Sequence, residues 1–195
     1  MLAIFKREFK SYFQNVIGWL FVAALLAVYG LYFYVYNLKN GYPYISYDLK
    51  GIGFIMMIAV PILTMRSLSD EKKTKTDQLM LTSPVSVGKI VAGKYFAMAA
   101  VYTIDIALFA LSPLVLSIYG KVALSEAYVA LFGYWLYGLS CIAVGLFISS
   151  ISESVIISAI LTFAALFLSY MMQSITGLIS SSGNLLTKVL NCFDL

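Results

Sequence analysis

The sequence predicts an all-α integral membrane protein with five transmembrane helices. Hydrophobic residues make up 62% of the 195 residues and charged residues only 11%, against about 45–50% and about 25% in soluble domains. About 20 helical residues cross a hydrocarbon core of about 30 Å, and five largely uncharged runs approach that length. No internal repeat or Pro-rich linker divides the chain, so residues 1–195 are expected to form a single membrane domain.

Residues 1–15 are predicted to form an amphipathic helix on the membrane surface. Apolar residues recur there in steps of three and four, which places them on one helical face and Lys6, Arg7 and Lys10 on the other. These three basic residues are expected to anchor the helix at the interface. Simple anchoring and the transmission of movement from a cytoplasmic partner both remain open for this helix.

The five spans are expected to differ in how clearly they are defined. The second uncharged run supplies only about 22 Å of helix, and it becomes long enough if it extends to Ser69 while Arg66 reaches back to the headgroups. Pro61 is expected to kink this span and Pro113 the third. The expected spans are residues 16–36, 51–65, 95–119, 127–149 and 155–176.

The distribution of basic residues predicts the orientation of the chain. With the N-terminus in the cytoplasm and residue 195 outside, the inner side carries the larger share of Lys and Arg, as expected in a plasma (inner) membrane. The inner set is Lys6, Arg7, Lys10, Arg66, Lys72, Lys73, Lys75, Lys89 and Lys94, and the outer set is Lys39, Lys50, Lys121 and Lys188.

Residues 69–94 form the only substantial loop on the predicted cytoplasmic side. Thr74 and Asp77 have the spacing of a capping box, and Pro84 cannot continue a helix, so a short helix is expected over about residues 75–82. This helix carries an apolar triplet, residues 79–81, on a loop otherwise rich in lysine. The triplet either docks on another protein or folds back onto the membrane surface.

The same loop contains a spacing that imitates a nucleotide-binding motif. Gly88, Gly93 and Lys94 fit G-x-x-x-x-G-K, but Tyr95 stands where a P-loop has Ser or Thr to hold magnesium. No strand pattern precedes the segment, which instead opens a membrane span. Nucleotide binding is therefore not expected here, and Lys94 is expected to anchor the span at the lipid boundary.

Two acidic residues are further candidates for function. Asp105 lies about 16 Å along the helix from Lys94, near the middle of the bilayer, where ionisable residues are costly and often functional. It could bind a substrate cation or a proton, or it could hydrogen-bond within the bundle. Glu153 lies at capping-box spacing from Ser150 and is either a helix cap or a contact for a cytoplasmic partner.

Composition excludes several classes of protein. Without histidine there is no Ser-His-Asp triad and no His-bearing zinc site. Two cysteines, Cys141 and Cys192, cannot form a four-thiolate metal site. No cluster of basic residues is combined with the aromatic residues that stack on bases in nucleic-acid-binding proteins. We therefore expect no catalytic residues, no metal and no cofactor in this chain, and no nucleic acid among its partners.

The loop residues resemble those of a known family. Met65-Arg66, Glu71, Thr76 and the run at 79–86, Leu-Met-Leu-Thr-Ser-Pro-Val-Ser, are similar to ABC-2 type transporter permeases, in the branch of gliding-motility and copper-processing exporters. Ile90-Val91 and Gly93-Lys94-Tyr95 extend the similarity. The resemblance is specific over about 30 residues.

The resemblance implies a permease subunit of an ATP-driven exporter, paired in the bilayer with a second permease copy or paralogue. Separate ATP-binding subunits would bind ATP and magnesium, and the helix at 76–82 would be the coupling helix seated in the ATPase. The residues expected to couple to the ATPase are Glu71, Thr76, Asp77, Leu79, Met80, Leu81, Thr82, Pro84 and Glu153.

The sequence departs from the family pattern at two points. Lys75 stands where the family usually has glycine, so the local turn is expected to differ. The family normally has six spans, which makes a chain truncated at Leu195 the expected explanation for five. The alternative function is a secondary transporter or channel-like subunit that uses Asp105, although such proteins more often show repeated topology.

Overall fold

A computed structural model of the chain describes residues 2–73, 75, 86–119 and 123–179. Every regular element in these ranges is helical, and five helical stretches are long and apolar enough to cross a membrane, which confirms the predicted fold class. The elements are α1 (Leu2–Gln14), α2 (Val16–Tyr32), the π-helix η1 (Phe33–Lys39), α3 (Ser46–Thr64), α4 (Ser69–Lys73), α6 (Val87–Phe109), α7 (Ser112–Tyr119), α8 (Leu124–Ile151) and α9 (Val155–Ile179).

Four of the five spans are longer than expected, and the second and third differ most from the expected bounds. The second runs over Ser46–Lys72 and the third over Val87–Ile118, whereas the expected boundaries were 51–65 and 95–119. The expectation stopped at charged residues, but Asp48 is buried in α3 and accepts a hydrogen bond from Asn37 of η1, and Lys94 is buried in α6. A charged side chain that is bonded to another residue inside the protein does not end a transmembrane helix.

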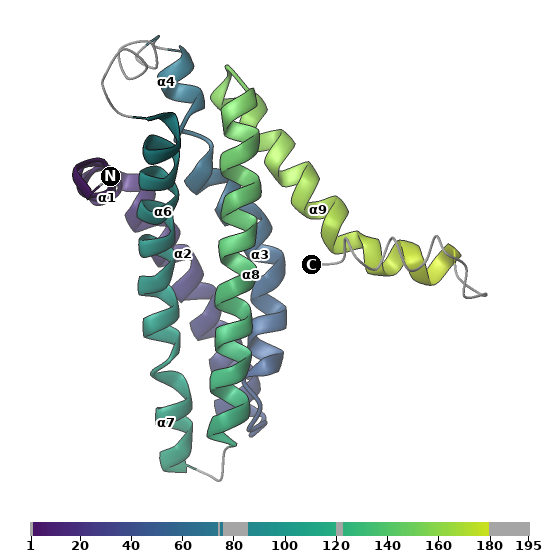
Figure 1. The fold of residues 1–195 in the computed structure, drawn as a ribbon. Helices are drawn as coiled ribbons and strands as arrows, with labels where there is room; N and C mark the ends of the chain where they lie inside the picture. The colour runs from purple at the N-terminus through teal and green to yellow at the C-terminus, as the bar shows by residue number, and fades with distance from the viewer. Residues whose placement is uncertain (1, 74, 76–85, 120–122, 180–195) are drawn as a thin grey trace.

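The bundle is built from α2, α3, α6 and α8, which run beside one another (Figure 1). The helix α9 begins beside the end of α8 that lies nearest α4 and extends from there at an angle to the bundle. The core of the bundle is apolar and closely packed, with fully buried Leu25, Ile52, Met56 and Met98 from three of its helices. The third span breaks between Phe109 and Ser112, immediately before Pro113, and resumes as α7.

Two glycines of α8 allow neighbouring helices to approach closely. The ring of Tyr102 in α6 lies against Gly138, in the space that a Cβ would need. The Oγ1 of Thr64 in α3 would lie 2.5 Å from a Cβ built on Gly145. Tyr102 also donates a hydrogen bond to the carbonyl oxygen of Tyr134 at 2.7 Å, so α8 holds α6 and α3 at short range.

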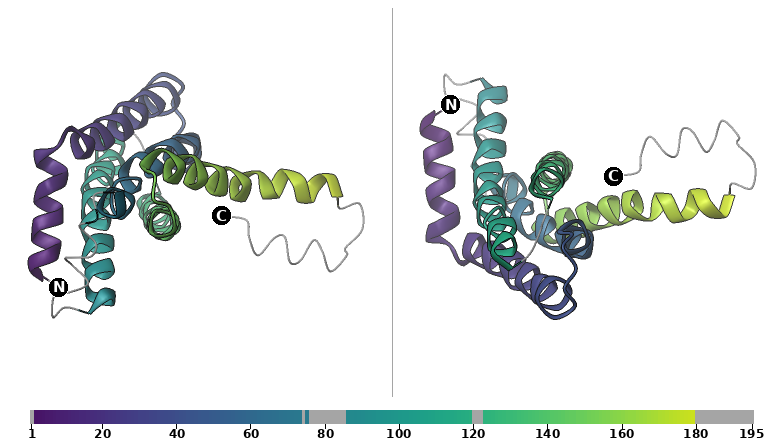
Figure 2. Two further views of the ribbon diagram at one scale, coloured as in Figure 1. Left: turned by 90° about the horizontal axis from the view of Figure 1, so that it is seen from above. Right: turned by 90° about the horizontal axis from the view of Figure 1, so that it is seen from below.

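The N-terminal helix α1 lies across the bundle rather than along it. It is seen end-on in Figure 1 and lengthwise when the molecule is viewed from above in Figure 2. Its apolar face forms a row of rings in which Phe5 contacts Phe9, Phe9 contacts Phe13 and Phe13 contacts Trp19 of α2. The helix and its row of rings agree with the predicted amphipathic pattern, while its position on a membrane surface stays a prediction.

Candidate functional site

A buried lysine joins three helices at the end of the bundle nearest α4. Only 2% of the Lys94 side chain in α6 is exposed, and its Nζ lies 2.7 Å from Oε1 of Glu71 in α4 and 3.4 Å from Oε1 of Glu8 in α1. The same Nζ donates a hydrogen bond to the carbonyl oxygen of Ser67 at 2.8 Å. We call these four residues, Glu8, Ser67, Glu71 and Lys94, the lysine joint.

The basic residues of α1 differ in their contacts with the lysine joint. Arg7 Nη2 lies 2.7 Å from Oε1 of Glu8 and 4.0 Å from Oε1 of Glu71, with more than half of its side chain exposed. Lys6 and Lys10 are exposed on α1. Arg7 therefore belongs to the charge network of the joint, while Lys6 and Lys10 form no ion pair with a described residue, and their role as membrane anchors stays a prediction.

The hydroxyl of Tyr12 also ties α1 to the second span. It donates a hydrogen bond to the carbonyl oxygen of Leu63 at 3.4 Å. Burial raises the pKa of Tyr12, and the negative charge of Glu8 raises it further. Tyr12 is therefore a neutral donor that holds α1 against the end of α3.

Serines bind the α4 segment to the end of α8. The Oγ of fully buried Ser149 accepts hydrogen bonds from the backbone N–H groups of Leu68 and Ser69, each at 3.2 Å. Ser69 Oγ donates to the carbonyl oxygen of Ser149 at 3.1 Å, and Lys72 Nζ donates to that of Ser150. Hydrogen bonds and ion pairs thereby connect the α4 segment to α8 as well as to α1 and α6.

The remaining predicted site residues near this end lie at the surface. Arg66 is exposed, as expected for a side chain that reaches the headgroups, and Glu153 is exposed in the turn between α8 and α9. Ser150, its expected capping partner, donates instead to the carbonyl oxygen of Phe147 at 2.6 Å. Lys94 differs from the anchoring prediction, because its side chain is paired inside the protein rather than extended to the lipid boundary.

The short helix predicted to dock on a partner lies outside the described residues. This concerns Thr76, Asp77, Leu79, Met80, Leu81, Thr82 and Pro84. Lys75, just before it, has a φ of 56°, in the left-handed region that glycine adopts without steric cost. The position where the sequence departs from the family pattern is thus one where the backbone takes a glycine-like conformation.

Asp105 lies further along α6 in different surroundings. It is fully buried, and neither of its carboxylate oxygens has a hydrogen-bond partner among the described residues. Tyr134 of α8 has an unpartnered buried hydroxyl as well. Within the described part of the chain, the Asp105 carboxylate therefore makes none of the hydrogen bonds expected as one of its roles.

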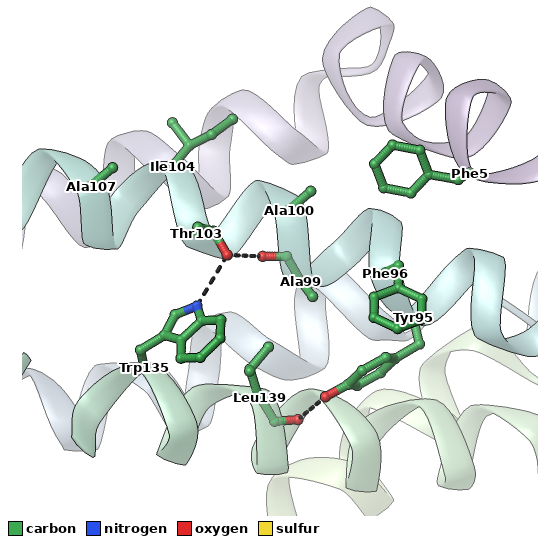
Figure 3. Close-up of a pocket in the computed structure, with 10 residues that line it drawn as sticks. All are labelled: Phe5, Tyr95, Phe96, Ala99, Ala100, Thr103, Ile104, Ala107, Trp135 and Leu139. Carbon is green, nitrogen blue, oxygen red and sulfur yellow. Dashed lines mark hydrogen bonds between the residues drawn. The ribbon is translucent and has the colours of Figure 1, made fainter. Parts of the chain in front are cut away.

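An apolar groove runs along α6 and α8 and ends against α1 (Figure 3). Its volume is about 530 Å³. Trp135 Nε1 donates to Thr103 Oγ1 at 3.1 Å across it, and Tyr95 Oη donates to the carbonyl oxygen of Leu139 at 3.3 Å. Its lining residues are Phe5, Tyr95, Phe96, Ala99, Ala100, Thr103, Ile104, Ala107, Trp135 and Leu139.

Comparison with protein families identifies the chain. A family model described as ABC-2 family transporter protein matches residues 32–193, which include four complete spans and most of the charge network around Lys94. The chain belongs to the ABC-2 transporter family. Comparisons with curated proteins and with solved structures find no match. As an ABC-2 permease it is a multi-pass membrane component of an ABC transporter, and it takes part in transport.

Sequence reasoning missed three residues that complete the charge and serine networks of this permease. Glu8 is the only acidic residue of α1 and pairs both with Arg7 of its own helix and with Lys94 of α6, and the sequence shows no signal for the second partner. Ser67 and Ser149 act through a backbone carbonyl and a hydroxyl, and nothing in the pattern of hydrophobic residues distinguishes them from other serines.

Proposed function

We propose that this chain is the membrane-spanning subunit of an ATP-driven exporter, moved by a separate ATPase subunit that binds ATP and magnesium. The lysine joint is the observation that carries the proposal. It connects the start of the cytoplasmic loop with the interfacial helix α1 and the transmembrane helix α6. A push on the loop thereby reaches two helices through one buried cation.

The loop itself supplies the contact for the ATPase. Leu79, Met80 and Leu81 form the apolar docking surface on the helix at 76–82, as in the gliding-motility and copper-processing branch of the family. Thr76, Asp77, Thr82 and Pro84 are the other residues that the resemblance assigns to this expected coupling helix, and Glu71, in α4 before it, is paired with Lys94. Exposed Glu153, in the turn between α8 and α9, offers a second contact on the same end.

The serine network supports transmission to the rest of the bundle. Leu68 and Ser69 are bonded to Ser149 near the end of α8, and α8 in turn holds α3 and α6 closely through Gly145 and Gly138. Closure of the ATPase would therefore displace the bundle as a connected unit. Two conformations with different affinity for the closed ATPase are the minimum requirement of such a mechanism.

The proposed assembly contains two permease chains, copies or paralogues, in one plasma membrane with the N-terminus and α4 in the cytoplasm. The excess of Lys and Arg on the α4 side supports this orientation. Labelling of a Met80→Cys variant from the cytoplasmic side checks it, in a Cys192→Ser background. Reaction only from the opposite side contradicts it.

Co-purification with the ATPase tests the docking surface. The double variant Leu79→Asp/Leu81→Asp is expected to lower recovery of the co-expressed ATPase about tenfold or more, because it places two charges in an apolar contact. Leu38→Asp is the matched control, since Leu38 is an exposed apolar residue at the opposite end of the first span. Undiminished recovery with the loop variant contradicts the proposed contact.

Asp105 favours one alternative, a secondary transporter or channel-like subunit that uses this carboxylate. The supporting observation is that both of its oxygens are buried without a partner among the described residues. This alternative expects transport that continues without the ATPase and ends with Asp105→Asn. The exporter proposal expects transport to require the ATPase.

A further inference from the structure

The length of the groove along α6 and α8 is close to the thickness of the hydrocarbon part of one membrane leaflet. Tyr95 and Ala107 mark its extent on α6, and 12 residues of helix span about 18 Å. One leaflet contributes about half of a hydrocarbon core of about 30 Å. Phe5 of α1, the helix that lies across the bundle, closes the groove at its α4 end (Figure 3).

The walls of the groove offer hydrocarbon rather than polar contacts. Thr103 Oγ1 accepts from Trp135 Nε1 and donates to the carbonyl oxygen of Ala99 at 2.7 Å. Tyr95 Oη is bonded to the carbonyl oxygen of Leu139. The hydroxyls and the indole N–H of the lining are thus bonded within the walls, while the ring of Phe96 is 51% exposed.

Positive charge lies beside the end of the groove that α1 closes. Lys6 follows Phe5 directly and Lys10 is one turn further along α1, and both are exposed. Neither forms an ion pair with another described residue, whereas Arg7 is paired with Glu8. A helix of this kind lies at the level of the lipid headgroups, so the two lysines are available to anionic phosphates there.

We propose that this groove binds one acyl chain of an anionic phospholipid, with the headgroup beside Lys6 and Lys10. The narrow apolar volume of about 530 Å³ suits a single chain. A second protein copy would instead require a broad face, since specific interfaces bury about 800 Å² per partner. The proposal is independent of the ATPase contact and goes beyond it.

Tryptophan fluorescence provides a direct test, because the chain has only two tryptophans and one of them lines the groove. In a Trp19→Phe variant of the full chain, reconstituted in vesicles, Trp135 reports contact with lipids that carry bromine on the acyl chain. We expect brominated phosphatidylglycerol to quench Trp135 at a lower mole fraction than brominated phosphatidylcholine. Each lysine is expected to contribute about fivefold to this preference. Equal quenching by the two lipids overturns the proposal.

Variants of the groove and of α1 separate chain binding from headgroup binding. Ala100→Phe fills the groove and is expected to abolish the preference, and Ala107→Leu is a milder version if the first variant does not fold. Ala24→Phe is the matched control, since Ala24 is exposed on α2 and distant from the groove lining. Lys6→Gln/Lys10→Gln is expected to lower quenching by phosphatidylglycerol to the phosphatidylcholine level.

Two further results would contradict the proposal. The first is an unchanged preference in Ala100→Phe. The second is a change in the oligomeric state of Ala100→Phe without lipid-dependent quenching in the parent, which would assign the groove to a second copy of the chain.

Discussion

Lys94 and Asp105 are buried ionisable residues of the same helix, and the protein treats them in opposite ways. Lys94 has two carboxylates and a carbonyl oxygen around its Nζ. Asp105 has no hydrogen-bond partner for either oxygen among the described residues. A buried charge is costly unless it is paired and hydrogen-bonded. Lys94 therefore holds helices together, whereas the cost of burying the Asp105 carboxylate is not offset by a hydrogen bond to another described residue.

The largest expected effect concerns the paired residue. Lys94→Met removes the buried cation that Glu8 and Glu71 share, although Arg7 stays near both, and loss of one partner of a buried pair costs about 3–5 kcal/mol. Because both glutamates keep 15–19% exposure of their side chains, we expect the lower end of that range. Thermal unfolding of the purified chain in detergent measures it.

A double-mutant cycle isolates the pair itself. Glu71→Gln is combined with Lys94→Met, and residues in one ion-pair network show coupling of about 0.5–3 kcal/mol. Lys89→Met is the matched control, because Lys89 is an exposed lysine in the first turn of α6. Strictly additive effects of the two substitutions would show that the joint carries no interaction energy.

The opposite sign is expected at the unpaired residue. Asp105→Leu is expected to stabilise the chain, by about 3 kcal/mol on the membrane-insertion scale. If the carboxylate serves transport, export falls in the same variant although stability rises. Unfolding and transport are measured on one preparation. A loss of stability would mean that Asp105 has a partner in the assembled protein, and the comparison with Lys94 would then fail.

The smallest expected effect lies at Lys75, in the segment between α4 and α6. Lys75 has a φ of 56°, and a left-handed conformation costs a residue with a Cβ about 1–2 kcal/mol. Lys75→Gly is expected to stabilise the chain by about 1 kcal/mol or less, because glycine loses more backbone entropy on folding. Lys73→Gly, within α4, is the control and is expected to destabilise. A loss of stability in Lys75→Gly would show that the lysine side chain matters more than the turn.

The fold was predictable because lipid imposes strong rules on sequence. A polar backbone must be hydrogen-bonded inside the bilayer, so the long apolar runs are predicted to be helices and the five spans follow from this rule. The helix α1 follows instead from the spacing of its apolar residues. The ends of the second and third spans did not follow. A sequence does not show that Asp48 meets Asn37 or that Lys94 meets Glu71, since these partners lie 11 and 23 residues away.

The candidate site was predictable only in part for the same reason. Lys6 and Lys10 of α1 and Arg66 near the end of α3 have exposed side chains, and their role as membrane anchors stays a prediction. Lys94 was recognised as important but was assigned to the lipid boundary, because hydropathy records the cost of a charge and not its partners. Glu8, 86 residues from Lys94 in sequence, could be joined to it only by the crossing of α1 over α6.

The spacing of the two ionisable residues on α6 has a consequence for how the helix can signal. Eleven residues are close to three full turns at 3.6 residues per turn, so Lys94 and Asp105 share one side of a single rod about 16 Å long. A rotation or translation of α6 at Lys94 therefore displaces Asp105 in the same direction. A spectroscopic probe near Asp105 would therefore report displacements at Lys94 in the same direction.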